Sequence, residues 1–213
     1  MRELSVLALL PYPLDTTPSQ RFRLEQWAPL LARDHGIHVH FSSFADERLF
    51  DLLARPGHVA AKAVRMAWAS ATRAGELRRA RVHDVVLVHR AACLAGPAWL
   101  ERLLAASGRP FVFDFDDAIW VRHTSGANAF FDRLKFPGKT ATLCRIASLV
   151  VAGCEYLAAY ARTHGRRVAV VCSVLLETWS EGKAPSYFPR TTPLPPGSKD
   201  VAGINWSRFG GNV

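Results

Sequence analysis

The chain has 213 residues, enough for one to two domains, and its 49% hydrophobic and 21% charged residues are typical of a globular protein. No apolar run reaches the roughly 18 residues that a membrane-spanning helix needs. The formal net charge is +9, but no recognisable DNA- or RNA-binding motif accompanies it, so we expect no nucleic-acid partner.

Six short and mostly continuous apolar runs predict β-strands. They cover residues 4–10, 37–43, 84–89, 110–115, 148–152 and 168–172. Strands without polar alternation are covered on both faces, as in a parallel sheet between helices. The first run, in MRELSVLALLPYP, also resembles a secretion signal. Glu3 contradicts a basic start and no small-residue cleavage site follows, so we interpret the run as a strand.

Segments with helical spacing of apolar residues lie between these runs. They cover residues 20–33, 47–54, 59–80, 97–106, 130–147 and 155–163, and Gly36 is a candidate left-handed cap after the first. The alternation predicts an α/β fold over residues 1–173, a Rossmann-like parallel sheet flanked by helices. From residue 185 on, nine of 29 residues are Pro or Gly. We therefore expect an irregular or disordered tail over 174–213.

The four cysteines are Cys93, Cys144, Cys154 and Cys172, and no two form a CxxC pair or show metal-ligand spacing. We therefore expect a reduced, cytoplasmic protein. Residues 55–81 carry seven Lys or Arg and one acid. Such a segment is either a solvated face or a helix on an anionic membrane, which would place the protein peripherally on the inner face of the plasma membrane. The candidate membrane contacts are Lys62, Arg65, Arg73, Arg78 and Arg79.

Polar residues gather after the predicted strands, where ligands bind in open parallel sheets. In PYPLDTTPSQRFR, Ser19, Arg21 and Arg23 lie where a loop enters a helix. A helix N-terminus and arginines suit a phosphate or carboxylate. The alternative is that Ser19 only caps the helix and the arginines are solvated.

The third and fourth strands end in charged residues. DVVLVHR ends in His89 and Arg90, which either contact a substrate or serve the structure. In FVFDFDD, alternation places Asp114 and Asp116 on one face while Asp117 begins the exit turn. Such carboxylates either accept a proton from a substrate hydroxyl or pair with the arginines of neighbouring strand ends.

The stretch VVAGCEYLAAYA follows the same pattern. Gly153 allows a tight turn from strand to helix, and Glu155 enters the first helical turn, where the dipole favours a carboxylate. Both residues are candidate substrate contacts, although a plain helix start explains them equally well.

The order of these segments resembles the N-terminal half of a family 4 glycosyltransferase, a retaining enzyme of the GT-B fold. The similar pieces lie within residues 4–173 and are the S-x-R-F-R loop, DVVLVHR, DFDDAIW, F-x-R-L-K-F-P-G-K and VVAGCEYLAAYA. The resemblance implies two Rossmann-like domains facing a cleft. The N-terminal domain binds mainly a saccharide or lipid acceptor, and the C-terminal domain binds a sugar nucleotide, without an obligatory metal.

The resemblance also implies residue roles and a place in the synthesis of cell-envelope polysaccharides. Ser19, Arg21 and Arg23 match the loop beneath the nucleotide phosphates and the acceptor. Many relatives have a His facing the acceptor where this chain has Asp116, so Asp116 and its neighbour Asp117 are the expected catalytic residues. Several members dock on membranes through a basic helix, which suits 55–81. Cys154 replaces an expected Asn, so no role of that amide carries over.

The family pattern ends after about residue 173, and the donor-binding half does not follow. We expect a truncated or frame-shifted product that is inactive alone. The alternative is a non-catalytic binding or regulatory module that pairs with a separate donor-domain chain. An unrelated dinucleotide-binding protein is disfavoured, because no GxGxxG follows the first strand.

Overall fold

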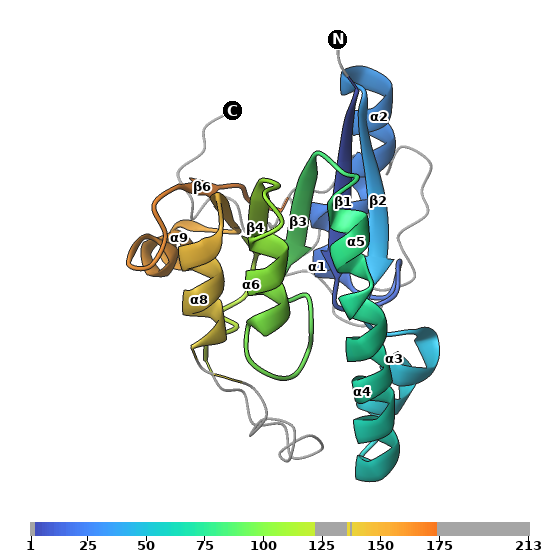
Figure 1. The fold of residues 1–213 in the computed structure, drawn as a ribbon. Helices are drawn as coiled ribbons and strands as arrows, with labels where there is room; N and C mark the ends of the chain where they lie inside the picture. Colours follow the sequence, from blue (N-terminus) through green and yellow to red (C-terminus); the bar gives the residue numbers. More distant parts are fainter. Residues whose placement is uncertain (1–2, 122–135, 137, 174–213) are drawn as a thin grey trace, which may run out of the picture. The chain divides into compact units, whose positions relative to one another are not determined.

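The computed structural model describes residues 3–121, 136 and 138–173. Six parallel strands form one sheet in the order β2-β1-β3-β4-β5-β6 (Figure 1). This is the predicted α/β Rossmann-like arrangement. The strands are β1 (Leu4–Leu10), β2 (Ile37–Ser43), β3 (Val85–His89), β4 (Phe111–Phe115), β5 (Leu149–Ala152) and β6 (Val168–Val170).

The strand order reverses at β1, which lies between β2 and β3. Leu7 pairs in register with His40 of β2 on one side and Val86 of β3 on the other. The chain leaves β1 toward one side of the sheet and later returns to the other. The connections therefore part at the carboxyl ends of β1 and β3, which is where open α/β sheets bind ligands.

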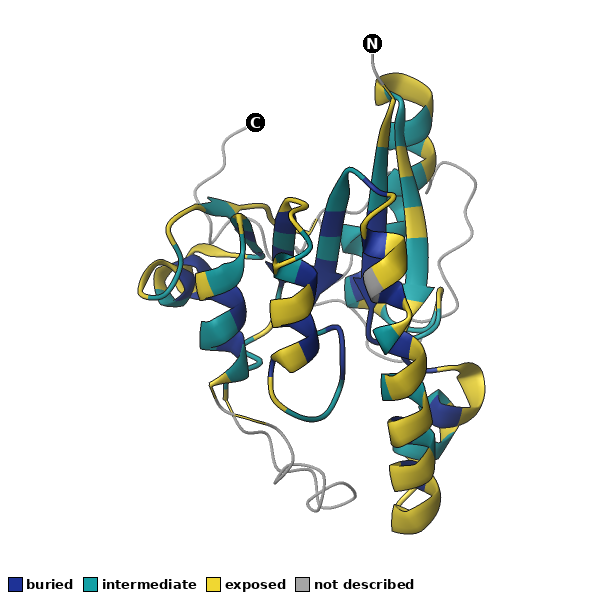
Figure 2. Ribbon diagram, in the orientation of Figure 1, coloured by how far each residue is buried: buried dark blue, intermediate teal, exposed yellow. Residues whose placement is uncertain are grey.

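Apolar burial explains why the central strands hold this place. Residues 7–10 of β1 are completely buried, as are Val86, Val88 and Phe113 of the neighbouring strands. Figure 2 shows these strands mainly in the buried colour, whereas partly buried and exposed residues alternate along the edge strand β2. The middle of the sheet is thus covered on both faces, as its continuous apolar runs predict.

The first connection differs from the single helix predicted over 20–33. It contains α1 (Pro18–Arg23), the 3-10 helix η1 (Glu25–Trp27) and α2 (Ala28–His35). Pro29 has no N–H to donate to the carbonyl four residues earlier, so a new helix begins beside it. The predicted left-handed cap at Gly36 is confirmed, with φ of 61°.

The second connection contains α3 (Glu47–Ala54), α4 (Val59–Ala74) and α5 (Glu76–Ala80). The single helix predicted over 59–80 is therefore divided, and the division falls at Gly75. Asp46 caps α3 by accepting a hydrogen bond from the Leu49 N–H at 2.7 Å.

The remaining helices are α6 (Trp99–Ala105), α8 (Lys139–Ile146) and α9 (Glu155–Arg162). In Figure 1, α5, α6 and α8 lie side by side in front of the sheet, while α2 packs against β2 and α9 against β5 and β6. The part of the predicted helix 130–147 before residue 136 and the predicted tail 174–213 lie outside the described residues. Among the described helices, none is both long and apolar enough to cross a bilayer.

Candidate functional site at the carboxyl edge of the sheet

The ends of β1, β3 and β4 bring most of the predicted site residues together. Two groups form there, and we call them the buried clamp and the acidic rim. The clamp is Arg23, Asp114, His89 and Ser19; the rim is Arg90, Asp116 and Asp117.

The buried clamp is a continuous chain of hydrogen bonds. Arg23 donates through Nε to both carboxylate oxygens of Asp114, at 3.1 and 3.0 Å, and through Nη2 to Oδ1. His89 Nδ1 lies 2.7 Å from Asp114 Oδ2, and its Nε2 lies 3.1 Å from Ser19 Oγ. Because an ionised carboxylate only accepts, Nδ1 carries the proton that His89 shares with Asp114.

Charge pairing decides the ionisation of the clamp. Burial alone would raise the pKa of the Asp114 carboxyl, but the hydrogen bonds from His89 and Arg23 outweigh burial and hold that pKa below its ordinary value. Burial lowers the pKa of Arg23, but the hydrogen bond and charge of Asp114, together with the charge of Asp116, raise it above its ordinary value, so the guanidinium stays charged. The clamp is therefore an ion pair with an oriented imidazole.

The clamp has the bonding order of a Ser–His–Asp catalytic triad, but its surroundings differ. The Arg23 side chain is only 3% exposed, His89 is completely buried, and Arg23 holds both oxygens of Asp114. Neither pocket described below includes Ser19 or His89. We therefore infer that the clamp holds α1 against the strand ends. The expectation that Arg23 and His89 contact substrate is corrected, because both side chains are buried in this structure.

The acidic rim follows the same strands but is open. Arg90 directly follows β3 and has a left-handed backbone with φ of 61°, an uncommon conformation for a residue with a side chain. Its Nη2 pairs with Asp117 Oδ2, and its Nε lies 3.8 Å from Asp116 Oδ1. The side chain of Asp117 is 62% exposed.

Asp116 differs from both of its acidic neighbours. Its Oδ1 atom is buried, and among the described residues no group donates a hydrogen bond to it. A buried carboxylate oxygen normally accepts a hydrogen bond. Asp116 Oδ1 can therefore accept one from a group that the described residues do not supply, such as a ligand hydroxyl or a water molecule.

Gly153 explains how Asp116 is held. A Cβ atom at position 153 would lie 2.9 Å from both Cα and Cβ of Asp116 and 3.4 Å from Arg23 Nη1. The turn after β5 thus approaches the acidic strand end so closely that only glycine fits. We therefore assign Gly153 to packing against Asp116. The sequence predicted only that Gly153 allows a tight turn.

Two predicted site residues lie apart from these groups. Arg21 pairs with Asp15 at 3.7 Å on the surface, and Glu155 pairs with Arg162 of its own helix. Glu155 does begin α9, as predicted, which suits the dipole of that helix. Neither residue contacts the clamp or the rim in the interactions described.

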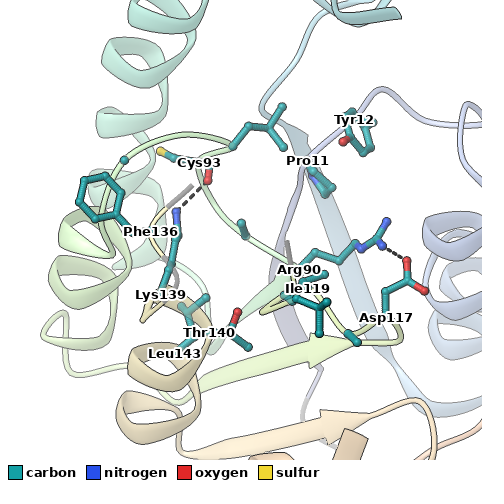
Figure 3. A pocket seen from close by; sticks show the side chains of 15 residues that line it. Pro11, Tyr12, Arg90, Cys93, Asp117, Ile119, Phe136, Lys139, Thr140 and Leu143 are labelled. Atoms are coloured by element: carbon teal, nitrogen blue, oxygen red, sulfur yellow. Dashed lines mark hydrogen bonds and ion pairs between the residues drawn. The ribbon is translucent and has the colours of Figure 1, made fainter. Parts of the chain in front are cut away.

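A pocket of about 490 Å³ opens beside the rim (Figure 3). Arg90 and Asp117 line it from the ends of β3 and β4, and Pro11 and Tyr12 line it from the end of β1. The pocket therefore lies at the place where the strand order reverses, as the topology requires of a ligand site.

One polar pair of the pocket wall was not predicted. Lys139 Nζ lies 2.8 Å from the completely buried Glu101 Oε1 and donates to the Cys93 carbonyl at 2.7 Å. The same Glu101 oxygen accepts from the N–H of Ala92 at 3.1 Å. One signal was available in the sequence: Lys139 begins a helix, where a cation opposes the dipole and thus calls for a carboxylate partner.

The basic segment divides into buried and exposed residues, and this corrects two predicted membrane contacts. Lys62 is 0% exposed and donates to the Arg55 carbonyl at 2.6 Å. Arg73 is 2% exposed, donates to the carbonyls of Leu10 and Ser42 at 2.9 Å each, and burial lowers its pKa to about 10. Both cations fix backbone and cannot reach a membrane in this structure. Arg65, Arg78 and Arg79 remain at least partly exposed.

The described residues contain no group of three or more His, Cys, Asp or Glu side chains that could hold a metal ion. A scan against protein-family models and a search of curated proteins give no match to this chain. Functional assignment therefore depends on the geometry of the site and on the resemblance of the motifs.

Proposed function

We propose that this chain provides the acceptor-binding domain of a retaining glycosyltransferase that uses a sugar nucleotide. The observation that carries the proposal is the acidic rim, which places two carboxylates and one arginine beside a pocket at the reversal point of the sheet. The donor sugar nucleotide is the second substrate. It is assigned to another domain, on this chain or on a separate one.

The proposed chemistry needs a carboxylate near the acceptor hydroxyl. The acceptor oxygen bonds to the anomeric carbon of the donor while the nucleoside diphosphate leaves with the bonding electrons, and the hydroxyl loses its proton. The Asp116 side chain is 15% exposed and the Asp117 side chain is 62% exposed, so both carboxylates are open at the rim. Either can orient the hydroxyl and receive its proton. Arg90 holds the two carboxylates at the rim.

A fusion of residues 1–173 to the donor half of a family 4 enzyme tests the proposal. We expect sugar transfer by the fusion, a loss of at least about 100-fold in Asp116→Asn, since positioned acid–base groups contribute about that much or more, and a smaller loss in Asp117→Asn. Arg109→Gln is the control, because the partner of Arg109 among the described residues is the Arg81 carbonyl, away from the rim. Full transfer by both aspartate variants would contradict the proposal.

The alternative function is a binding or regulatory module that pairs with a donor-domain chain without chemistry of its own. Acceptor binding by the unmodified chain together with full transfer in the Asp116→Asn fusion would favour this alternative. The two functions thus make opposite predictions for one variant.

Membrane contact is a further part of the proposal. Val64 and Trp68 on α4 are 70% and 76% exposed, and they border an open groove between α3 and α4 that also includes Arg65. Exposed apolar side chains next to arginines suit the surface of an anionic bilayer. Charge reversal of Arg65, Arg78 and Arg79 is expected to reduce sedimentation with phosphatidylserine vesicles. Reversal of Arg145, Arg166 and Arg167 changes the net charge equally and is the control; equal losses in both variants would contradict the assignment.

A further inference from the structure

The pocket beside the acidic rim has walls that are mainly apolar. Figure 3 shows its lining side chains, which come from the loops after β1, β3 and β4 and from α8. The apolar members include Leu94, Ile119, Val121, Phe136 and Leu143. A volume of about 490 Å³ lies within the range of pockets that enclose small organic ligands.

Among the described residues, two cations line the pocket, and each is paired with a carboxylate. Arg90 pairs with Asp117 at the mouth, and Lys139 pairs with the buried Glu101 behind the wall. Lys139 also gives a hydrogen bond to the Cys93 carbonyl, which further occupies its ammonium group. A phosphate or pyrophosphate in this pocket would have to break one of these ion pairs, and it would meet the carboxylate of Asp117.

Polar groups that suit a hydroxyl are the rim carboxylate of Asp117 and the hydroxyls of Tyr12 and Thr140, which also line the pocket (Figure 3). Asp117 lines the pocket with an exposed carboxylate, and Asp116 precedes it in the chain. An occupant with several hydroxyls can bond to these three polar groups and place its apolar part against Ile119 and Leu143. This is the arrangement of an amphiphilic ligand without charge.

We propose that the pocket binds the apolar part of a neutral acceptor, a glycoside or other polyol that carries an aryl or short alkyl group. This inference depends on the proposed function, because it names the acceptor class of the same site. It differs from a phosphate-bearing lipid acceptor, for which the pocket offers no unpaired cation among its described lining residues.

Isothermal titration calorimetry of the full chain, without any sugar nucleotide, tests the acceptor class. The ligands are the p-nitrophenyl and methyl glycosides of glucose, galactose and mannose, together with p-nitrophenyl phosphate. We expect at least one p-nitrophenyl glycoside to bind at least tenfold more tightly than its methyl counterpart and than p-nitrophenyl phosphate. Equal binding of aryl and methyl glycosides, or tighter binding of the phosphate, would overturn the inference.

Two matched valine variants locate the binding. Val121 lines the pocket and is 45% exposed, whereas Val82 is 78% exposed and lines neither described pocket. Val121→Trp fills part of the pocket and is expected to reduce the aryl preference at least fivefold. Val82→Trp is expected to leave it unchanged, and equal effects of both variants would also overturn the inference.

Failure of this inference and failure of the proposed function can be told apart. Aryl preference in the titration with full transfer by the Asp116→Asn and Asp117→Asn fusions would leave the ligand class standing and reject the catalytic role of the two aspartates, in favour of the binding module. Transfer that depends on the aspartates but treats aryl and methyl acceptors alike would reject only the inference.

Discussion

The buried clamp and the acidic rim each pair an arginine with aspartate at the carboxyl edge of the sheet, yet their environments differ. Asp114 is surrounded by Arg23 and His89 with both oxygens bonded, whereas Asp117, three residues later, is largely exposed. The sequence FVFDFDD does not distinguish these carboxylates. Burial distinguishes them. A buried carboxylate whose oxygens are both bonded within the protein stabilises the fold, whereas an exposed carboxylate that lines a pocket is available to bind a ligand.

The largest effect that separates the two groups is expected for loss of the clamp carboxylate. Asp114→Asn leaves the buried Arg23 without its counter-charge, which typically costs about 3–5 kcal/mol of unfolding free energy. Asp117→Asn changes an exposed group and is expected to cost less than about 1 kcal/mol. Urea denaturation of both variants measures the difference, and equal costs would remove the distinction between clamp and rim.

Packing of the rim is tested by a pair of glycine variants. Gly153→Ala puts a methyl group 2.9 Å from Asp116, and overpacking of this kind costs about 1–3 kcal/mol. Gly138→Ala is the control, because a Cβ there meets nothing within 4 Å. The same denaturation experiment applies; if Gly153→Ala is as stable as Gly138→Ala, the close approach at the strand end is wrong.

Acid sensitivity is expected to follow the clamp. The folded-state pKa of Asp114 is lowered, so its stabilisation is complete above the ordinary Asp pKa of about 3.9 and is lost as the pH falls through the lower folded value. Each unit of lowering contributes about 1.4 kcal/mol. Unfolding free energies measured from pH 6 down to pH 3 should fall less steeply in Asp114→Asn than in the unchanged protein. Parallel pH profiles would contradict the pairing of Asp114.

The smallest change in stability is expected at Arg90. The left-handed backbone of Arg90 costs a residue with a side chain about 1–2 kcal/mol of stability. Arg90→Gly would remove this strain but would also remove the ion pair with Asp117. The two effects oppose each other, so we expect a net change within about 1 kcal/mol by urea denaturation. Acceptor binding by calorimetry should nevertheless weaken, because Asp117 loses the group that positions it. A strongly destabilised Arg90→Gly would place Arg90 with the clamp instead of the rim.

The sequence predicted the sheet better than the helices between its strands. Residues 4–10 were predicted with the observed bounds, because a continuous apolar run identifies a buried parallel strand. Residues 37–43 also have the predicted bounds, although apolar and polar residues alternate along them. The segment 20–33 is helical as predicted but is divided into three short helices, because Pro29 has no N–H for a continuous helix. Local pattern thus identifies which segments are buried, and single residues decide where helices end.

The candidate site was predicted by residue but not by role. Strand ends correctly indicated where His89, Arg90 and Asp114 meet, because parallel strands finish at one edge of the sheet. Periodicity did not show that Lys62 and Arg73 point inward, because the hydrogen bonds that hold them reach backbone carbonyls, which every residue has. The contact of Glu101 with Lys139 joins positions 38 residues apart and depends on the folded chain.

Arg23 has one bonding partner beyond the clamp. Its Nη1 donates to the Val171 carbonyl at 2.8 Å and to Ser173 Oγ at 3.3 Å, just after β6. One guanidinium therefore ties the connection between β1 and β2 to residues 171–173, which follow β6. A displacement of residues 171–173 would therefore displace Arg23, which also holds both carboxylate oxygens of Asp114. The position of these residues and the order of the buried clamp are thus expected to depend on each other.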